Sequence, residues 1–453
     1  MAGGESPPRR FPTTNRMDQE VPLTTAQRPA KRGLIAALKD TTFRSLRHRN
    51  YRRYFLGQIV SFVGSWMQSA ALMWLLYDRT GDPRWPSWVL VAQVGPTLLL
   101  GTWGGNLADR YPKRRLVFAT QSAFLAHAVL LTLLLALGLA PPALVLGLMA
   151  VSGVIQAVDL PARLAFVPDL VPREDLINAV ALNSLLFNSA RAIGPALAAL
   201  LFLVAEAVAP LLPGASPVTL GAVACFALNA VSFLAVLFAL AGITVSGSPP
   251  AATGRKGGAW DGFRYLRERP ATGALVLLTL VLCVFGWPLV TLLPAYTRTQ
   301  LGRGEQTYSL LVSALGAGAL LAALAAATFG TAARRGKFMM IGAAVAPVGL
   351  LGVSQATRPE LAGAACAAAG FGLILYLATG QSVLQLAVPD DRRGRVMALW
   401  AMTLSASAPL GHLMAGHAVT VFGVRPVLVA MAAGTGLAAA ALIALVTVRG
   451  VGE

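Results

Sequence analysis

The sequence predicts an all-α polytopic membrane protein with twelve transmembrane helices in two six-helix halves. Of its 453 residues, 56% are hydrophobic and only 12% are charged. A water-soluble domain carries about 25% charged residues, so this chain has too little polar surface to cover a globule in water. Apolar runs recur along the chain, each close to the roughly 20 residues that a helix needs to cross a bilayer. These runs lack the alternation of membrane-barrel strands, so we expect them to be helices.

The predicted spans are separated by short segments rich in Gly, Pro and charged residues, where helices end and polar chain reaches water. We expect spans at residues 54–77, 86–107, 116–137, 142–163, 177–204, 217–242, 271–297, 307–329, 338–356, 360–386, 396–420 and 426–447. With an even number of crossings, the two termini lie on the same side of the membrane.

The loops predict the orientation, because segments on the cytoplasmic side retain Lys and Arg. Most of the 37 Lys and Arg residues lie before the first span or in every second loop after it. The other loops hold only Arg79, Arg84, Arg298, Arg303, Arg358 and Arg425. We therefore expect a bacterial inner-membrane protein with both termini in the cytoplasm. The formal net charge of +18 follows this topology, so nucleic acid is not an expected partner.

The longest charged interior segment separates six spans from six, and its Gly-, Ser-, Pro- and Ala-rich start is typical of a linker. The sequence divides into a basic cytoplasmic tail at residues 1–50, an amino-terminal half at 51–242, a cytoplasmic linker at 243–270 and a carboxy-terminal half at 271–453. A Val-Pro-Asp tripeptide follows the fourth span at residues 167–169 and the tenth span at 388–390. This echo indicates an internal parallel repeat.

The loop between the second and third spans carries the sharpest local signal. It reads Gly-Asn-Leu-Ala-Asp-Arg-Tyr-Pro-Lys-Arg-Arg over residues 105–115. At this place in a twelve-span chain, the run resembles the loop signature of the major facilitator superfamily, G-x-L-a-D-R-x-G followed by two Lys or Arg residues. Pro112 stands where the family often has Gly, so the turn is made differently. The resemblance implies a secondary transporter with a central cavity between its halves.

The resemblance also implies roles for the residues of this loop. Asp109 is expected to face the amino-terminal end of the eleventh span, whose free amides carry partial positive charge, as a gate that holds the outward-open state. Arg110, Lys113 and Arg114 are expected to be available to cytoplasmic carboxylates, although the alternative that these cations only fix the orientation stays open. Gly105 is expected to let the second span approach another helix closely.

A second resemblance runs from Asp159 to the Arg-Ala-Ile-Gly-Pro segment at residues 191–195. This stretch is similar to a bacterial subgroup of drug and siderophore exporters that includes the enterobactin exporter. Gly194 and Pro195 resemble the export-associated Gly-Pro motif of drug/proton antiporters, although alanines replace the glycines that usually follow. The resemblance therefore implies export.

Three charged side chains lie within the fourth and fifth spans, where a charge at the bilayer centre costs about 3 kcal/mol on insertion scales. They are Asp159, Arg163 and Arg191. We expect them to form a buried cluster across the two spans, and two interpretations stay open. The cluster is either a static ion pair or a coupling site in which Asp159 takes up and releases a proton.

Other polar or aromatic residues within the spans are candidates for substrate contact, with hydrogen bonding between helices as their alternative role. They are Trp66, Gln68, Asn183, Asn188, Gln381, Gln385, Trp400 and His412. The three cysteines lie far apart within spans, and His412 and His417 point to different helix faces. We therefore expect neither a metal site nor a cofactor. The sequence contains no nucleotide-binding or hydrolase motif, so it does not predict an enzyme.

The favoured function is proton-driven efflux of a small amphiphilic compound, such as a drug or a siderophore, by alternating access. Two alternatives stay open: a lipid or lysolipid flippase of the same fold, and a non-transporting membrane receptor or scaffold. The expected partners are a small-molecule substrate, protons and membrane lipids. We expect the chain to act as a monomer.

Overall fold

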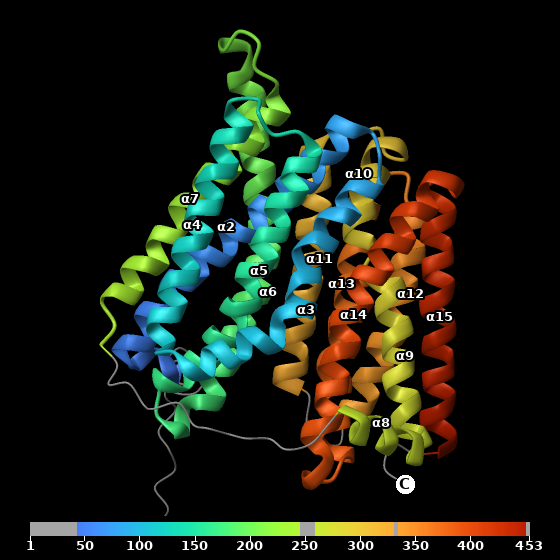
Figure 1. Cartoon of the computed structure of the whole chain (residues 1–453). Helices are drawn as coiled ribbons and strands as arrows, with labels where there is room; N and C mark the ends of the chain where they lie inside the picture. The colour runs from blue at the N-terminus through green and yellow to red at the C-terminus, as the bar shows by residue number, and fades with distance from the viewer. Residues whose placement is uncertain (1–42, 245–258, 330–333, 450–453) are drawn as a thin grey trace, which may run out of the picture. The chain divides into compact units, whose positions relative to one another are not determined.

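The computed structural model describes residues 43–244, 259–329 and 334–449, and these ranges contain helices and no strand (Figure 1). The long helices of the first half are α2 Arg49–Thr80, α3 Arg84–Arg110, α4 Lys113–Ala136, α5 Pro142–Phe166, α6 Leu176–Val208 and α7 Pro217–Ala241. The second half contains α9 Pro270–Gly286, α10 Leu289–Thr299, α11 Glu305–Phe329, α12 Arg335–Gln355, α13 Pro359–Ala387, α14 Asp390–Phe422 and α15 Val424–Arg449. Short helices lie at η1 Arg44–Arg47, η2 Val167–Asp169, η3 Arg173–Asp175, η4 Ala209–Leu211 and α8 Ala259–Glu268.

The predicted spans correspond to α2–α7, to α9 with α10, and to α11–α15. In the described part of the chain, eleven helical segments are long and apolar enough to cross a membrane. The span outside the eleven is α3, which has 27 residues but contains Gln93 and four glycines that lower its hydropathy. The helix packs against α5 of its own half and α14 of the other half.

The seventh span differs from the expectation of one helix over residues 271–297. It is broken between α9 and α10, at Trp287 and Pro288. Pro288 has no backbone N–H, so the carbonyl oxygen of Val284, four residues earlier, loses its helical donor. Gly411 of α14 lies against this oxygen, and a Cβ on Gly411 would be only 2.4 Å from it. Helix α14 therefore packs directly against the backbone at the break.

Prolines inside α3 and α5 also free carbonyl oxygens, and a glycine of the neighbouring helix lies close to each of these oxygens. Pro161 of α5 frees the carbonyl oxygen of Ala157, and a Cβ on Gly104 of α3 would lie 2.0 Å from that oxygen. Conversely, Pro96 of α3 frees an oxygen that a Cβ on Gly153 of α5 would approach to 3.0 Å. A side chain at Gly104 would overlap backbone, so the close contact between these two helices requires glycine there.

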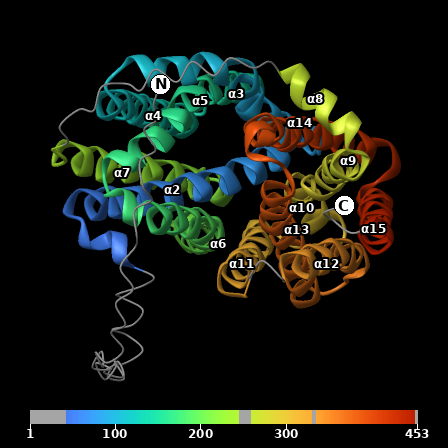
Figure 2. The same ribbon diagram turned by 90° about the horizontal axis from the view of Figure 1, so that it is seen from below.

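The two sets of helices meet along two lines, α6 against α11 and α3 against α14 (Figure 2). Within the first half, α2 packs on α6 and α7, and α4 packs on α5 and α7. Within the second half, α13 packs on α11 and α12, while α15 packs on α9 and α12. Residues from α6 and α11 therefore meet in the middle of the molecule.

The two ends of the bundle differ in charge. We call one the basic end, which holds the loops with Arg110, Arg115, Arg173, Arg267 and Arg395. We call the other the opposite end, which holds the loops with Arg79, Arg84, Arg298, Arg303, Arg358 and Arg425. Most of the predicted tail at residues 1–50 and half of the predicted linker at 243–270 lie outside the described residues, so the division of the chain into four segments stays a prediction.

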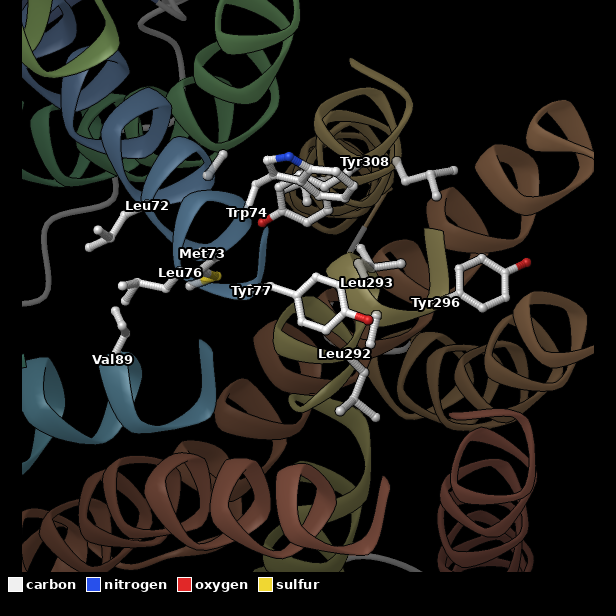
Figure 3. Close-up of a cluster of buried hydrophobic side chains, with 14 of the residues drawn as sticks. Leu72, Met73, Trp74, Leu76, Tyr77, Val89, Leu292, Leu293, Tyr296 and Tyr308 are labelled. Atoms are coloured by element: carbon white, nitrogen blue, oxygen red, sulfur yellow. The ribbon is translucent and has the colours of Figure 1, made fainter. Parts of the chain in front are cut away.

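At the opposite end, aromatic and aliphatic side chains join the halves (Figure 3). Trp74 of α2 stacks on Tyr308 of α11 with ring centroids 5.4 Å apart, and Leu292 of α10 belongs to the same buried cluster. Arg298 of α10 forms an ion pair with Asp78 of α2 and lies over the Trp74 ring, its guanidinium carbon 5.2 Å from the centroid. The halves are therefore closed against each other at this end.

Candidate functional site

Asp159 of α5 is almost fully buried, with 1% of its surface exposed. One carboxylate oxygen accepts hydrogen bonds from Thr120 Oγ1 at 2.7 Å and Gln121 Nε2 at 2.9 Å, both on α4. The other lies 2.5 Å from Arg163 Nε, an ion pair whose angle does not meet hydrogen-bond geometry. The Arg163 guanidinium carbon lies 4.8 Å from the ring centroid of Phe62 on α2. The Asp159–Arg163 pair therefore links three helices of the first half, α2, α4 and α5.

Arg191 of α6 is also buried, with 8% of its surface exposed, but the structure does not pair it with Asp159. Its guanidinium carbon lies 5.5 Å from the ring centroid of Trp66 on α2 and 5.2 Å from that of Trp287 at the α9–α10 break. Each such cation–π contact offsets about 0.5–2 kcal/mol of the cost of burying a charge. Aromatic faces do not replace the acceptors that a guanidinium's five N–H groups require. The predicted cluster of three charges is therefore one ion pair and a separate arginine.

Gly194 and Pro195 set the position of Arg191. A Cβ on Gly194 would lie 2.7 Å from the Cβ of Trp66, so α6 needs glycine there to pack on α2. Pro195 frees the carbonyl oxygen of Arg191, and a Cβ on Gly316 of α11 would lie 2.4 Å from this oxygen. The Gly-Pro motif therefore seats Arg191 against its own half and against α11 of the other half.

A narrow pocket that is partly open to solvent lies beside Arg191. Its other lining residues come from the second half, from α9 through α13 and the α9–α10 break, and none of them is charged. Small residues on three helices, Gly286, Ala346 and Ala369, are among them. Arg191 is thus the first half's contribution to a chamber with otherwise uncharged walls.

The loop between α3 and α4 is at the basic end, where Asp109 and Arg110 are exposed. Within the described residues, Asp109 makes no hydrogen bond or ion pair. Lys113 pairs with Asp169 of η2 at 3.0 Å, and Arg114 donates to the last carbonyls of α7 at 2.9 and 3.1 Å. Of the loop cations, Lys113 therefore pairs with a carboxylate and Arg114 binds the carboxyl end of a helix.

The expected role of Gly105 is wrong. A Cβ on Gly105 would meet nothing within 4 Å, whereas Gly104 makes the close approach to α5 described above. The two positions are adjacent, but they lie on different faces of α3, and only Gly104 lies against α5. The periodicity of the sequence does not tell which of the two glycines is on that face.

The remaining candidates for substrate contact lie in several different places. Gln68 of α2 accepts a hydrogen bond from Asn229 of α7 at 2.5 Å, and His412 of α14 is 3.0 Å from the hydroxyl of Thr291 on α10. These two hold helices together. Trp400 is 1% exposed and packs in the core of the second half.

The other four positions do not line the pocket beside Arg191. Asn188 donates to the carbonyl of Ser184 on its own helix at 2.9 Å, and Asn183 is half-buried on α6. Gln381 and Gln385 are exposed on the part of α13 that leads to the basic end. Of the candidates, Trp66 is the residue that contacts Arg191.

Sequence reasoning missed four residues of these two sites. Thr120 and Gln121 formed an adjacent polar pair within a predicted span, and Trp287 preceded a proline within another. Those were usable signals. Phe62 had none, because an aromatic residue in an apolar span is ordinary.

A sequence profile described as transmembrane secretion effector matches residues 40–452. The chain belongs to this family of the major facilitator superfamily. The transporter is similar to the enterobactin exporter of Shigella boydii, with 25% identity over 86% of this chain and 89% of that protein. It is also similar to macrolide efflux protein A of Streptococcus pyogenes, with 23% identity over 79% of this chain and 86% of that protein.

A third relative matches a shorter stretch of the transporter. The staphyloferrin A transporter of Staphylococcus aureus is 31% identical over 149 residues, which are 33% of this chain and 38% of that protein. The match thus spans little more than a third of that relative's length. These relatives identify a secondary transporter of small molecules, and such proteins are not enzymes.

Solved structures confirm the twelve-helix fold. A bacterial homologue of the human lysosomal transporter Spinster has a TM-score of 0.65 at 15% identity, over 87% of this chain and 97% of that chain. A nucleoside transporter has a TM-score of 0.64 at 14% identity, over 88% of this chain and 100% of that chain. The transporter is therefore a multi-pass membrane protein of the major facilitator fold.

Proposed function

We propose that this transporter exports a small amphiphilic compound from a bacterial cell by alternating access and that protons drive the export. The enterobactin and macrolide relatives support export of a siderophore-like or drug-like molecule. The concentration of Lys and Arg at the basic end supports a cytoplasmic location for that end and for both termini.

The difference between the two ends of the bundle carries this proposal. Trp74, Tyr308 and the Arg298–Asp78 ion pair hold the halves together at the opposite end, whereas Asp109 at the basic end has no partner among the described residues. Alternating access requires one end to be closed while the other is open, and then the reverse. In our proposal the present structure, with its opposite end closed, is the cytoplasm-open state. Asp109 then engages the amino-terminal end of α14 after the halves rock to the outward-open state.

Asp159 is the proposed proton site of this cycle. Burial disfavours a charged carboxylate, whereas a nearby cation and hydrogen bonds to the charged form favour it. Arg163 brings a positive charge to the Asp159 carboxyl group, and Thr120 and Gln121 bring hydrogen-bond donors. If rocking of the halves separates Arg163 from Asp159, the carboxylate binds a proton, and re-formation of the pair releases it.

A transport assay tests the function. Cells that produce the transporter are loaded with a panel of macrolides and siderophores and compared with cells that carry the empty vector. We expect lower accumulation of at least one compound in the producing cells, and an uncoupler should raise it to the vector level. Equal accumulation across the panel, or a difference that persists with the uncoupler, would contradict proton-driven export.

Cysteine labelling tests the orientation. An impermeant maleimide should label Arg303→Cys in intact cells and should label Arg267→Cys only after permeabilisation, because both positions are exposed but lie at different ends of the bundle. The native Cys225, Cys283 and Cys366 are buried, so the unmodified protein gives a low background. The reverse pattern of labelling would show that the basic end faces outward.

A further inference from the structure

Arg191 has hydrogen-bonding capacity that the described part of the protein does not use. Arg163 is partly buried and Arg191 is buried, and both lie beside aromatic rings, but they differ in one respect. Arg163 has the carboxylate of Asp159 beside it, whereas Arg191 has the two rings of Trp66 and Trp287 and no carboxylate. The proposed proton cycle uses the first arginine and leaves the second without a role.

The surroundings of Arg191 indicate what kind of group would bind its guanidinium. The side chain borders the cavity, and no other lining residue is charged. A lone cation in a chamber with uncharged walls attracts an anion strongly, because little water or counter-charge screens it. The planar fork of a guanidinium matches the two oxygens of a carboxylate, which is why arginine is common where such groups are recognised.

The rest of the cavity favours an apolar partner. Leu289, Leu315, Leu350 and Leu373 come from four different structural elements of the second half and supply aliphatic walls. Gly286 and the alanines of α12 and α13 add no bulky side chain to these walls. A ligand that lies against these walls therefore has an apolar body and one negatively charged end, and the narrow pocket has to widen to admit it.

We infer that Arg191 binds an oxyanion, such as a carboxylate, on the apolar compound that this transporter exports. The inference rests on the proposed export function and adds the charge class of the substrate. Arg191 comes from the first half and the cavity walls come from the second half, so a bound ligand contacts both. Substrate binding is thereby joined to the interface that alternating access must rearrange.

Binding to the full-length protein in detergent tests the inference by equilibrium dialysis. One arm uses 2-naphthoate and its neutral methyl ester, which share the apolar body and differ in charge. A second arm uses lysophosphatidate, in which a lipid supplies the oxyanion. We expect the wild type to bind 2-naphthoate about tenfold more tightly than the ester, because a hydrogen-bonded ion pair is lost in the ester.

Three variants separate recognition from folding. Arg191→Gln should bind 2-naphthoate and the ester equally, and Arg191→Lys should keep part of the preference, since it retains the charge without the planar fork. Arg303→Gln, which removes an exposed arginine at the opposite end, should behave as the wild type does. If Arg191→Gln fails to give a monodisperse protein, the wild type and Arg191→Lys decide the result.

Several results would overturn the inference. They are equal affinity of the wild type for 2-naphthoate and its ester, no binding of either anion, or a preference that persists in Arg191→Gln. Binding of lysophosphatidate through Arg191 without binding of 2-naphthoate would place the oxyanion on a lipid and refute a soluble substrate. The dialysis assay measures binding without a pH gradient. An intact preference for the anion, together with no export in the accumulation assay, would therefore refute the proposed function and not this inference.

Discussion

Replacing Asp159 by asparagine should abolish uphill, pH-driven efflux and leave downhill exchange between compartments of equal pH. Asparagine can still accept the hydrogen bonds of Thr120 and Gln121, so the contacts between α4 and α5 remain. It cannot bind and release a proton, and it removes the charge beside Arg163. The expected result is therefore loss of coupling without loss of the substrate path. Proteoliposomes with and without an imposed pH gradient measure the two activities separately.

Asp82→Asn is the matched control. Asp82 also pairs with an arginine, but it lies in the loop between α2 and α3, where hydrogen bonds from Arg84 hold the pKa of its carboxyl below the usual value. It stays ionised near neutral pH and has no proposed part in the cycle. Loss of both activities in Asp159→Asn would indicate a static ion pair. Wild-type uphill transport would remove Asp159 from the mechanism.

Replacing Asp109 by asparagine should leave the amount of protein in the membrane unchanged and slow transport by about tenfold or more. The charge has no partner in the present state, so its removal costs the folded protein little. In the outward-open state, the proposed contact with the amino-terminal end of α14 would contribute about 0.3–2 kcal/mol, the range for charges at helix ends. The upper part of that range corresponds to the expected loss of rate.

Flux at several substrate concentrations, normalised to the transporter in the membrane, measures this effect. A gate residue should lower the maximal rate and change the affinity less, because Asp109 is remote from the cavity beside Arg191. Wild-type flux at equal expression would show that the loop acid has no gating role. Loss of the protein from the membrane would show a structural role instead.

The spans could be predicted because hydropathy and chain breaks are local properties of the sequence. The break at Pro288 could not be, since prolines also lie inside the continuous helices α3, α5, α6 and α12. Whether a proline breaks a span depends on the helices around it. A sequence identifies the proline, but it does not show what packs against the freed carbonyl.

The candidate site was predictable where its parts lie on one helix. Asp159 and Arg163 are four residues apart, so a helix brings them to the same face and they pair as expected. The partner of Arg191 depends on how α6 is rotated against α2 and the second half, and this information is not local. For the same reason the sequence pointed to Gly105 when Gly104 is the packed position.

The break between α9 and α10 makes α10 a short lever. The helix has 11 residues and is therefore about 16 Å long. Trp287, just before it, touches Arg191, and Leu292 and Tyr296 along it belong to the cluster that closes the opposite end. A displacement of Trp287 would be carried along this helix wherever the helix moves as one rigid body. A ligand that draws Arg191 away from Trp287 would thus act through α10 on the cluster that closes the opposite end. Binding of the substrate would itself help to open the end through which the substrate leaves.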